Sequence, residues 1–298
     1  MENNCELVSS RGLLKSCSIR HPNPQTAEVN LHEYLENMNQ HENMSIYVNS
    51  HSLATFVDVY LSRIHCKFFL VSGDSDLGVP EEVLNEQQFQ TLLSNPYLIK
   101  WFAQNLLAKA TDKLCHLPIG LDYHTILQDP SHWWRMECDN EGYLPGEQEI
   151  LLKSIRDESK PFYERSKKIF CNVHFRPDRY KQRESAIAAI PEELMDKANQ
   201  HLARSQTWNR KAQNTFVLSP FGNGYDCHRT WEALCLGSIP IMKVPEFSEL
   251  FEGLPVINVE DWSDITSEFL EKKVEELKST SVNMEKLTLA YWVKQFRP

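Results

Sequence analysis

Apolar strand segments alternate with helical patterns along the second half of this chain, and this alternation limits the fold more than any other feature. Strands are expected at residues 168–173, 215–220, 239–243 and 255–259, with helices at 179–189, 191–204, 227–237, 246–252 and 266–278. Strands and helices that alternate at this spacing form βαβ units around a parallel sheet. The second half therefore predicts an α/β fold.

The first half carries the same signals less regularly. Strands are expected at 45–50, 67–73 and 114–120, and helices at about 30–39, 53–64, 81–110 (broken near Pro96) and 147–165. A chain of 298 residues is long enough for two compact lobes. We predict an N-terminal Rossmann-like lobe over 1–164, a C-terminal lobe over 165–280, and a helix over 281–298 that packs back on the first lobe.

Composition excludes several classes of protein. The chain has 31 Lys and Arg against 41 Asp and Glu, a net charge of −10, which is unsuited to holding nucleic acid over its whole surface. It lacks an apolar run long enough to span a membrane and the pattern of a secretory signal. Its eight cysteines form no CxxC pair, so neither disulfides nor a zinc site are expected. We expect a soluble, cytoplasmic protein.

The segment from Asn214 to Pro240 carries the strongest functional signal. A strand leads into a loop with Ser219, Gly222 and Gly224, and a helix follows. Glycines let a backbone approach a ligand closely, and free N–H groups at a helix start attract anions. Arg229 lies in the first helical turn, where its guanidinium suits phosphate oxygens, and Glu232 lies one turn further on the same face.

Each part of this unit also has a plainer interpretation. A Gly-x-Gly pair is a turn in most sequences, and an Arg and a Glu three residues apart usually form a solvated ion pair. The combination in one strand–loop–helix unit is what favours a nucleotide diphosphate ligand, with Arg229 on the phosphates and Glu232 on the ribose hydroxyls.

The segment "FVLSPFGNGYDCHRTWEALCLGSIPIM" resembles the signature of the exostosin-like glycosyltransferases, glycosyltransferase family 47. The resemblance extends over about residues 165–265. It implies the GT-B fold, two Rossmann-like lobes facing a cleft, with the nucleotide-sugar donor held by the C-terminal lobe. It also implies an inverting transfer that requires no metal. Where the family often has a serine before the arginine, this chain has Cys227 and His228.

The family's usual membrane anchor is also missing here. This departure points to members from large viruses of algae (chloroviruses), which glycosylate their own capsids. Because some members of the family transfer pentoses, UDP-xylose is a candidate donor among the UDP-sugars, which would make the protein a xylosyltransferase. The expected partners are this nucleotide sugar and the hydroxyl of an oligosaccharide or glycoprotein glycan.

A basic loop follows the strand at 168–173. Arg176 and Arg183 lie in it, together with Arg179 and Lys181, and form a local cationic patch in an acidic protein. The family has a comparable pair of arginines at this place, so Arg176 and Arg183 are predicted to contact phosphate. The alternative is a solvated helix start.

Two aspartates follow the strand at 67–73, in the loop "GDSDLGVP". Ligands of parallel sheets lie at the carboxyl ends of strands, so Asp74 or Asp76 is predicted to take the proton from the acceptor hydroxyl. The same Asp-x-Asp after an apolar strand matches the motif that holds Mn²⁺ or Mg²⁺ in GT-A glycosyltransferases. A metal-dependent GT-A enzyme is therefore the first alternative, and a non-catalytic protein that binds nucleotide or sugar is the second.

The acceptor side is predicted from loops of the first half. His51 follows the strand at 45–50, and His116 lies in the segment 114–120. Trp133, in the long irregular stretch after residue 120, offers an aromatic face on which a sugar ring can stack, although buried aromatic mass is the commoner use. These three residues are the predicted acceptor ligands.

Overall fold

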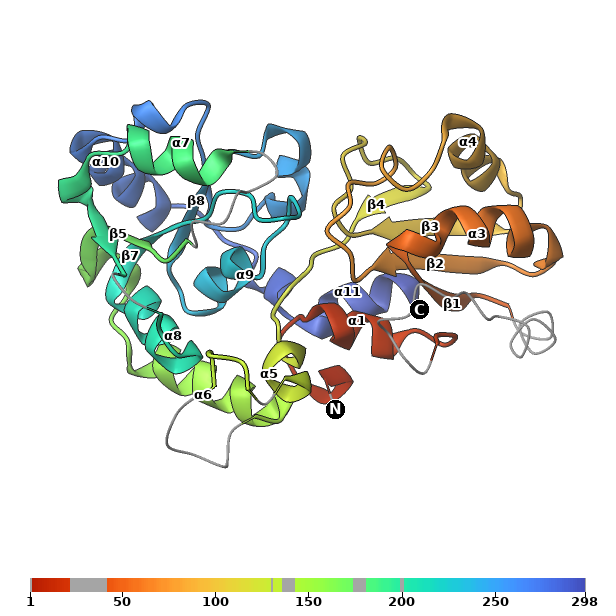
Figure 1. Cartoon of the computed structure of the whole chain (residues 1–298), viewed down its shortest axis with the longest axis horizontal. Coiled ribbons are helices and arrows are strands. Elements are labelled where there is room, and N and C mark those ends of the chain that lie inside the picture. Colours follow the sequence, from red (N-terminus) through yellow and green to blue (C-terminus); the bar gives the residue numbers. More distant parts are fainter. Residues whose placement is uncertain are drawn as a thin grey trace.

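The structure is a computed structural model that describes residues 2–21, 42–129, 131–135, 143–173, 181–198 and 201–297. Two lobes lie side by side, each built around its own parallel sheet (Figure 1). The expected helix at 30–39 lies outside the described residues. The prediction of an α/β fold with two Rossmann-like lobes is confirmed.

The sheet of the first lobe has the strand order β1-β2-β3-β4, and all its neighbours pair in parallel. Its strands are β1 (Met44–Asn49), β2 (Phe68–Gly73), β3 (Leu98–Ala103) and β4 (Leu114–His116). Every residue of β2 is buried, as expected for an inner strand of a parallel sheet covered on both faces.

Successive side chains of these strands serve opposite faces. On one face Ile46 and Leu70 pack under a helical run and α4, and on the other Tyr47 and Val71 pack against α1 and α11. The helical run consists of η2 (Ser50–Ser52), α3 (Leu53–Thr55), the π-helical η3 (Phe56–Tyr60) and η4 (Leu61–Arg63). The other covering elements are η1 (Glu2–Asn4), α1 (Ser10–Ser16), α4 (Glu86–Ser94), η9 (Met284–Leu287) and α11 (Leu289–Phe296).

The sheet of the second lobe has the order β6-β5-β7-β8-β9 and is also parallel. Its strands are β5 (Ser166–Cys171), β6 (Met195–Lys197), β7 (Asn214–Leu218), β8 (Ile239–Met242) and β9 (Ile257–Asn258). Ile169 and Phe216 pack against α7 and α10 on one face. Phe170 and Val217 pack with Ala233 of α9 on the other.

Several helices surround this sheet, and residues of three of them line the site described below. They are α6 (Pro145–Glu158), η5 (Phe162–Glu164), α7 (Gln182–Ala189), η6 (Glu192–Leu194), α8 (Arg204–Gln213), α9 (His228–Cys235), η7 (Pro245–Phe251), η8 (Trp262–Asp264) and α10 (Ser267–Lys278). The first lobe also contributes the short helix α5 (His124–Gln128), near the crossing between the lobes.

Two helix predictions from the sequence are wrong. Residues 98–103, expected to be helical, form strand β3, because Pro96 ends α4 and the following aromatic and apolar run pairs with β2. The helix expected at 191–204 is replaced by η6 and β6, and α8 begins only at Arg204. Both errors concern short strands whose sequence pattern also suits a helix.

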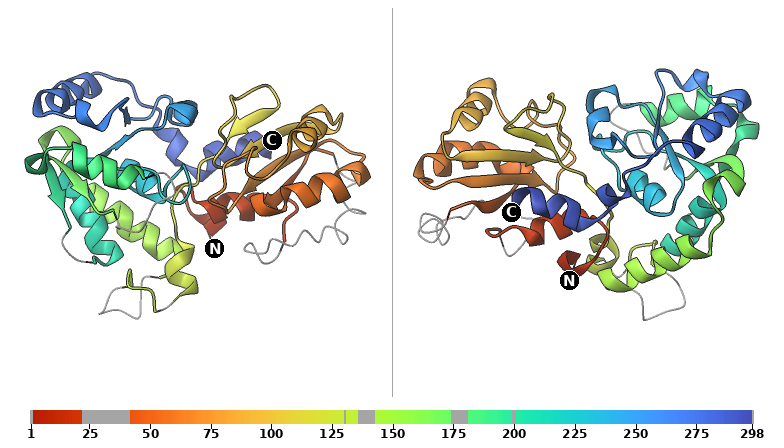
Figure 2. Two further views of the ribbon diagram at one scale, coloured as in Figure 1. Left: turned by 45° about the horizontal axis from the view of Figure 1, so that its top comes forward. Right: turned by 180° about the vertical axis from the view of Figure 1, so that it is seen from behind.

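The C-terminal helix returns to the first lobe, as predicted. α11 lies beside α1 and beneath β2, and the ring centroids of Phe296 and Phe102 are 5.7 Å apart (Figures 1 and 2). Helix α6, which the predicted boundary at 164 assigns to the first lobe, packs along α8 and α9 of the second. Within the described residues, no helix combines the length and the apolar character that crossing a bilayer requires.

Candidate functional site

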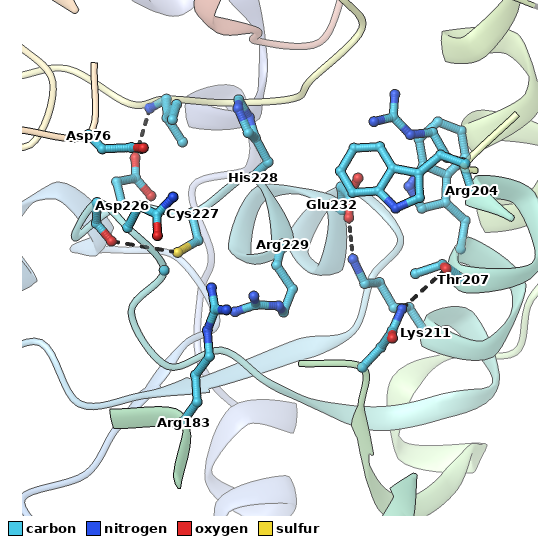
Figure 3. A pocket seen from close by; sticks show the side chains of 17 residues that line it. Asp76, Arg183, Arg204, Thr207, Lys211, Asp226, Cys227, His228, Arg229 and Glu232 are labelled. Carbon is cyan, nitrogen blue, oxygen red and sulfur yellow. Dashed lines mark hydrogen bonds and ion pairs between the residues drawn. The ribbon is translucent and has the colours of Figure 1, made fainter. Parts of the chain in front are cut away.

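A cavity of about 350 Å³ lies between the two lobes, and we call it the interlobe pocket (Figure 3). Asp76 and Ile119 line it from the first lobe, and α8, α9 and the loop 222–227 line it from the second. These loops follow the carboxyl ends of parallel strands, where such sheets place their ligands. The predicted donor residues Arg229, Glu232, Arg183, Gly222 and Gly224 all line this pocket.

Two guanidinium groups face each other in the interlobe pocket. Arg229 donates from Nη1 to the carbonyl oxygen of Pro220 at 3.0 Å, and Arg183 donates from Nε to that of Phe221 at 3.3 Å. Figure 3 shows their charged ends pointing toward one another. Among the described residues Arg229 forms no ion pair with a carboxylate. Because like charges repel, this arrangement favours an anion between the two side chains.

The start of α9 adds to this positive field. The helix begins at His228, and its N-cap residue Cys227 makes no side-chain capping hydrogen bond. Cys227, His228 and Arg229 all line the interlobe pocket. The positive end of the helix dipole and the N–H groups of the first turn therefore act on the region that the two arginines border.

An ionised carboxylate lies one helical turn further along α9. Lys211 of α8 forms an ion pair with Oε2 of Glu232, and the Lys211 side chain is only 2% exposed. Burial opposes the charge of Glu232, but Lys211 and Arg204 outweigh it and hold the pKa of this carboxyl below its ordinary value. An ionised carboxylate accepts hydrogen bonds and donates none, which suits a ligand that carries hydroxyl groups.

Aromatic rings form the wall beside Glu232. The guanidinium of Arg204 lies 4.6 Å from the ring centre of Trp134 and 5.6 Å from that of Trp208. Trp134 lines the interlobe pocket, whereas the predicted Trp133 does not. Trp133 is 37% exposed and its ring lies 4.8 Å from that of His201. The structure thus brings the neighbouring indole, and not Trp133, to the pocket.

The loop residues predicted with Arg229 have distinct surroundings. A Cβ on Gly222 would lie 3.3 Å from Arg183, and one on Gly224 would lie 3.2 Å from both Asp76 and Asn105. Gly224 therefore allows the loop to approach the first lobe as well as the pocket. Ser219 is buried and its Oγ bonds to Oγ1 of Thr230 at 2.8 Å, so it lies behind the pocket lining.

A second cavity, of about 400 Å³, adjoins the first on the side of the N-terminal lobe, and we call it the side pocket. Its lining includes His51, Asp74, Asp76, His124 and His228. Nε2 of His51 lies 3.1 Å from Oγ of Ser75. The predicted proton acceptors Asp74 and Asp76 and the predicted acceptor ligand His51 therefore share one cavity.

Asp74 is held in an uncommon backbone conformation at the end of β2. Its φ of 54° lies in the left-handed region, and its N–H donates to Oε1 of Gln104 at 2.9 Å. Asn49 donates to its carbonyl at 3.2 Å. Nε of Arg11 lies 3.7 Å from the carboxylate. Burial raises the pKa of Asp74 despite this cation, which moves the group toward the range of a general base.

His116 lies apart from both pockets. Its side chain is buried, and Nε2 lies 3.6 Å from Oε2 of Glu249. It lines a separate groove with residues of η7, η9 and α11, which shares no lining residue with the interlobe or side pocket. The structure does not bring His116 together with the other predicted acceptor ligands. Arg176 lies outside the described residues.

Three hydrogen bonds join the lobes next to the interlobe pocket. Oδ2 of Asp226 accepts from the N–H of Ile119 at 2.7 Å, and the N–H of Asp226 donates to Oδ1 of Asn105 at 2.8 Å. Nδ1 of His228 lies 2.7 Å from the carbonyl oxygen of Gly120. Burial raises the pKa of the Asp226 carboxyl to about 6.

The wall that α8 contributes is not among the features predicted from the sequence. Arg204, Trp208 and Lys211 all line the interlobe pocket. Their spacing of i, i+4 and i+7 places them on one helix face, and this is the signal that was available. It went unused because α8 was not expected as a helix. Among the described residues, no cluster of three or more His, Cys, Asp or Glu side chains could hold a metal ion.

Comparison with known proteins gives weak matches to solved structures only. No protein-family model matches the chain, and no curated protein does. A structure described as trehalose-6-phosphate from E. coli, bound with UDP-2-fluoro glucose, aligns with 9% identity over 85% of this chain and 70% of that one, at a TM-score of 0.37. An alpha1,3-fucosyltransferase with GDP-fucose aligns with 14% identity over 97% of this chain and 94% of that one, at a TM-score of 0.36.

Proposed function

We propose that this protein is a glycosyltransferase whose nucleotide-sugar donor binds in the interlobe pocket. The observation that carries the proposal is the pair of facing guanidinium groups, Arg183 and Arg229, at the start of α9. A diphosphate is an anion whose oxygens suit both guanidinium groups at once. The ionised Glu232 lies one turn of α9 beyond Arg229. The ribose of a nucleotide whose diphosphate binds Arg229 would lie beside this carboxylate.

The chemistry assigned to this pocket follows from its charges. Breaking the bond between the sugar and the diphosphate leaves negative charge on the phosphate oxygens. Arg229, Arg183 and the N-terminus of α9 would stabilise that charge as it develops. A group of the side pocket, which adjoins the donor, would take the proton of the attacking hydroxyl. Asp74 and Asp76, the residues predicted from the sequence for this role, both line that cavity.

The finer points come from the sequence and remain proposals. These are an inverting transfer without a metal, a UDP-sugar as donor with UDP-xylose among the candidates, and a glycan hydroxyl as acceptor. We also propose membership of the exostosin-like family from the motif at 216–242, together with the viral and xylosyl assignments that this resemblance suggests.

A calorimetric panel tests the proposal directly. UDP, GDP, UDP-xylose, UDP-glucose and UDP-GlcNAc are titrated into the protein in EDTA and then in Mn²⁺. We expect one nucleotide and its sugar conjugate to bind in EDTA, and Arg229→Ala to abolish that binding. Arg156→Ala is the matched control, because Arg156 is a half-buried arginine of α6 outside the pocket.

The other outcomes separate the alternatives. Binding only in Mn²⁺, lost in Asp74→Asn and Asp76→Asn, would favour the metal-dependent GT-A enzyme. Binding without release of nucleoside diphosphate under any condition would favour a non-catalytic binding protein. No binding of any nucleotide would remove the support for the proposed function.

A further inference from the structure

Three residues line both the interlobe pocket and the side pocket: Asp76, Ile119 and His228. In a sugar transfer, the acceptor hydroxyl attacks the sugar at the carbon whose bond to the nucleoside diphosphate breaks. If the donor fills the first cavity and the acceptor the second, that point lies beside these shared residues. Ile119 carries no group that exchanges protons. Asp76 and His228 are therefore the side chains placed to take one.

The ring of His228 is oriented by the backbone of the first lobe. Nδ1 lies 2.7 Å from the carbonyl oxygen of Gly120. A carbonyl oxygen only accepts hydrogen bonds, so Nδ1 carries the hydrogen in this contact. In the neutral ring the other nitrogen, Nε2, then has a free lone pair and can accept a proton. The His228 side chain is half-buried, whereas that of Asp76 is exposed.

Gly120 is itself fixed in place. Its φ of 64° lies in the left-handed region, and a Cβ there would lie 2.5 Å from the carbonyl oxygen of Val8. Ser9 pairs with Gly120 as an antiparallel bridge, and the N–H of Leu121 donates to Val8 at 2.8 Å. This packing determines where the Gly120 carbonyl points, so Gly120 is a positioning residue for the imidazole.

Charged groups from several elements surround His228. Positive charge on His228 is one of the influences that lower the pKa values of Asp74, Asp122 and Asp226, so all three carboxyl groups lie within its electrostatic reach. The neighbouring ring of His124, 6.0 Å away, stays neutral because burial lowers its pKa to about 3. Two nearby cations form ion pairs with carboxylates: Arg11 pairs with Asp74, and Arg204 pairs with Asp122.

We propose that Nε2 of His228 takes the proton from the attacking hydroxyl at the junction of the two pockets. The step rests on the proposed function. The hydroxyl oxygen bonds to the anomeric carbon of the sugar while its proton moves to Nε2. The bond between that carbon and the diphosphate oxygen breaks, and its electron pair leaves with the nucleoside diphosphate. The imidazolium then releases the proton to solvent. In this assignment Asp74 stabilises the imidazolium, and Asp76 is the rival proton acceptor.

The substitution His228→Asn tests the roles of the two ring nitrogens separately. The asparagine Nδ2 occupies the place of Nδ1 and keeps a donor for the Gly120 carbonyl, but nothing replaces Nε2. The probe is the UDP-sugar that binds in the panel, with water as the acceptor and release of UDP as the readout. We expect the rate to fall about 10²- to 10⁴-fold, the usual contribution of a general base, with donor affinity unchanged. His65→Asn, an exposed histidine outside both pockets, is the control and should release UDP at the wild-type rate.

Two results would overturn the assignment. One is a rate in His228→Asn within a few-fold of wild type, with a large loss in Asp76→Asn. The other is loss of donor affinity in His228→Asn, which would make His228 a donor ligand. If no nucleotide binds the wild-type protein in the panel, the proposed function fails instead.

A second measurement does not depend on turnover. Two-bond ¹H–¹⁵N spectra of the histidine rings, with His228→Asn to assign the signal, report which nitrogen carries the hydrogen. We expect the Nδ1–H tautomer for His228 at pH 7.5. An Nε2–H tautomer, or a ring already protonated at that pH, would leave no lone pair to accept the proton and would contradict the proposal.

Discussion

The two walls of the interlobe pocket hold their polar side chains in different ways. On the side of the second lobe, Lys211 and Glu232 are buried together as an ion pair, and Arg204 donates to Gln148 at 2.7 Å. On the side of the first lobe, Asp76 is exposed, as is His51 of the adjoining side pocket. Folding of the protein fixes the side chains of the wall from the second lobe. The wall from the first lobe is held mainly by its backbone. The difference suits the proposed functions of the two sides, a fixed site for the proposed donor beside a more adaptable site for the proposed acceptor.

The buried ion pair gives the largest expected effect. Lys211→Met leaves the Glu232 carboxylate buried without its main partner, which costs about 3–5 kcal/mol in the free energy of unfolding. Urea unfolding measures this loss. The double substitution Lys211→Met with Glu232→Leu should recover most of it, since no unpaired charge remains.

The matched substitution on the other wall is Asp76→Asn, which removes the charge of an exposed side chain. It should change the free energy of unfolding by less than about 0.5 kcal/mol. If Lys211→Met lowers the free energy of unfolding by no more than Asp76→Asn does, the contrast between the two walls is wrong.

Donor affinity gives the next effect. Arg229→Ala should weaken nucleotide binding by about 2–5 kcal/mol, roughly 30-fold to several thousand-fold, because a charge contact within a pocket is lost. Calorimetry with UDP and GDP measures it. A variant that binds both nucleotides as the wild type does would mean that the diphosphate lies elsewhere.

The contact between the lobes predicts a dependence on pH. Asp226 keeps its proton up to about pH 6 in the folded protein, because it is buried, whereas an unfolded chain releases it near pH 4. The folded state therefore binds more protons between those values, and its stability falls as the pH rises through this window. Asp226→Asn should remove this fall, which is about 3 kcal/mol at most.

Unfolding of both proteins at several pH values between 4 and 7.5 measures the difference. Asp157→Asn, at an exposed position of α6, should follow the wild-type curve. Parallel curves for Asp226→Asn and the wild type would show that the Asp226 carboxyl does not titrate in this range.

Substitutions at two glycines give smaller effects on stability than these, with opposite signs. Gly120→Ala should lower the free energy of unfolding by about 1–3 kcal/mol, because φ is positive and the new Cβ meets the Val8 carbonyl. It should also slow transfer by displacing the carbonyl that orients His228. Gly146→Ala, where nothing lies within 4 Å of the new Cβ, should stabilise α6 by about 0.5–1 kcal/mol. Urea unfolding measures both, and equal stabilities for the two variants would contradict the role of Gly120.

Local patterns predicted most strands of both sheets. The apolar runs at 67–73 and 215–220 became β2 and β7, with ends shifted by one or two residues. The run at 98–103 was wrongly expected to be helical, because a short apolar segment after a proline fits either structure until its pairing partner is known. Likewise, Arg229 and Glu232 were found from one strand–loop–helix unit, whose members are close in sequence.

The sequence by itself determined the alternation of strands and helices, the glycine loop, and the arginine and carboxylate of α9. These depend on side-chain periodicity and on spacing over a few residues. The tertiary structure decided which loops face one another. The contacts of Asp226 with Ile119 and of His228 with Gly120 join residues 107 and 108 positions apart, and Lys211 reaches Glu232 only across two packed helices. Such contacts depend on how the lobes and helices pack, and no local pattern encodes them.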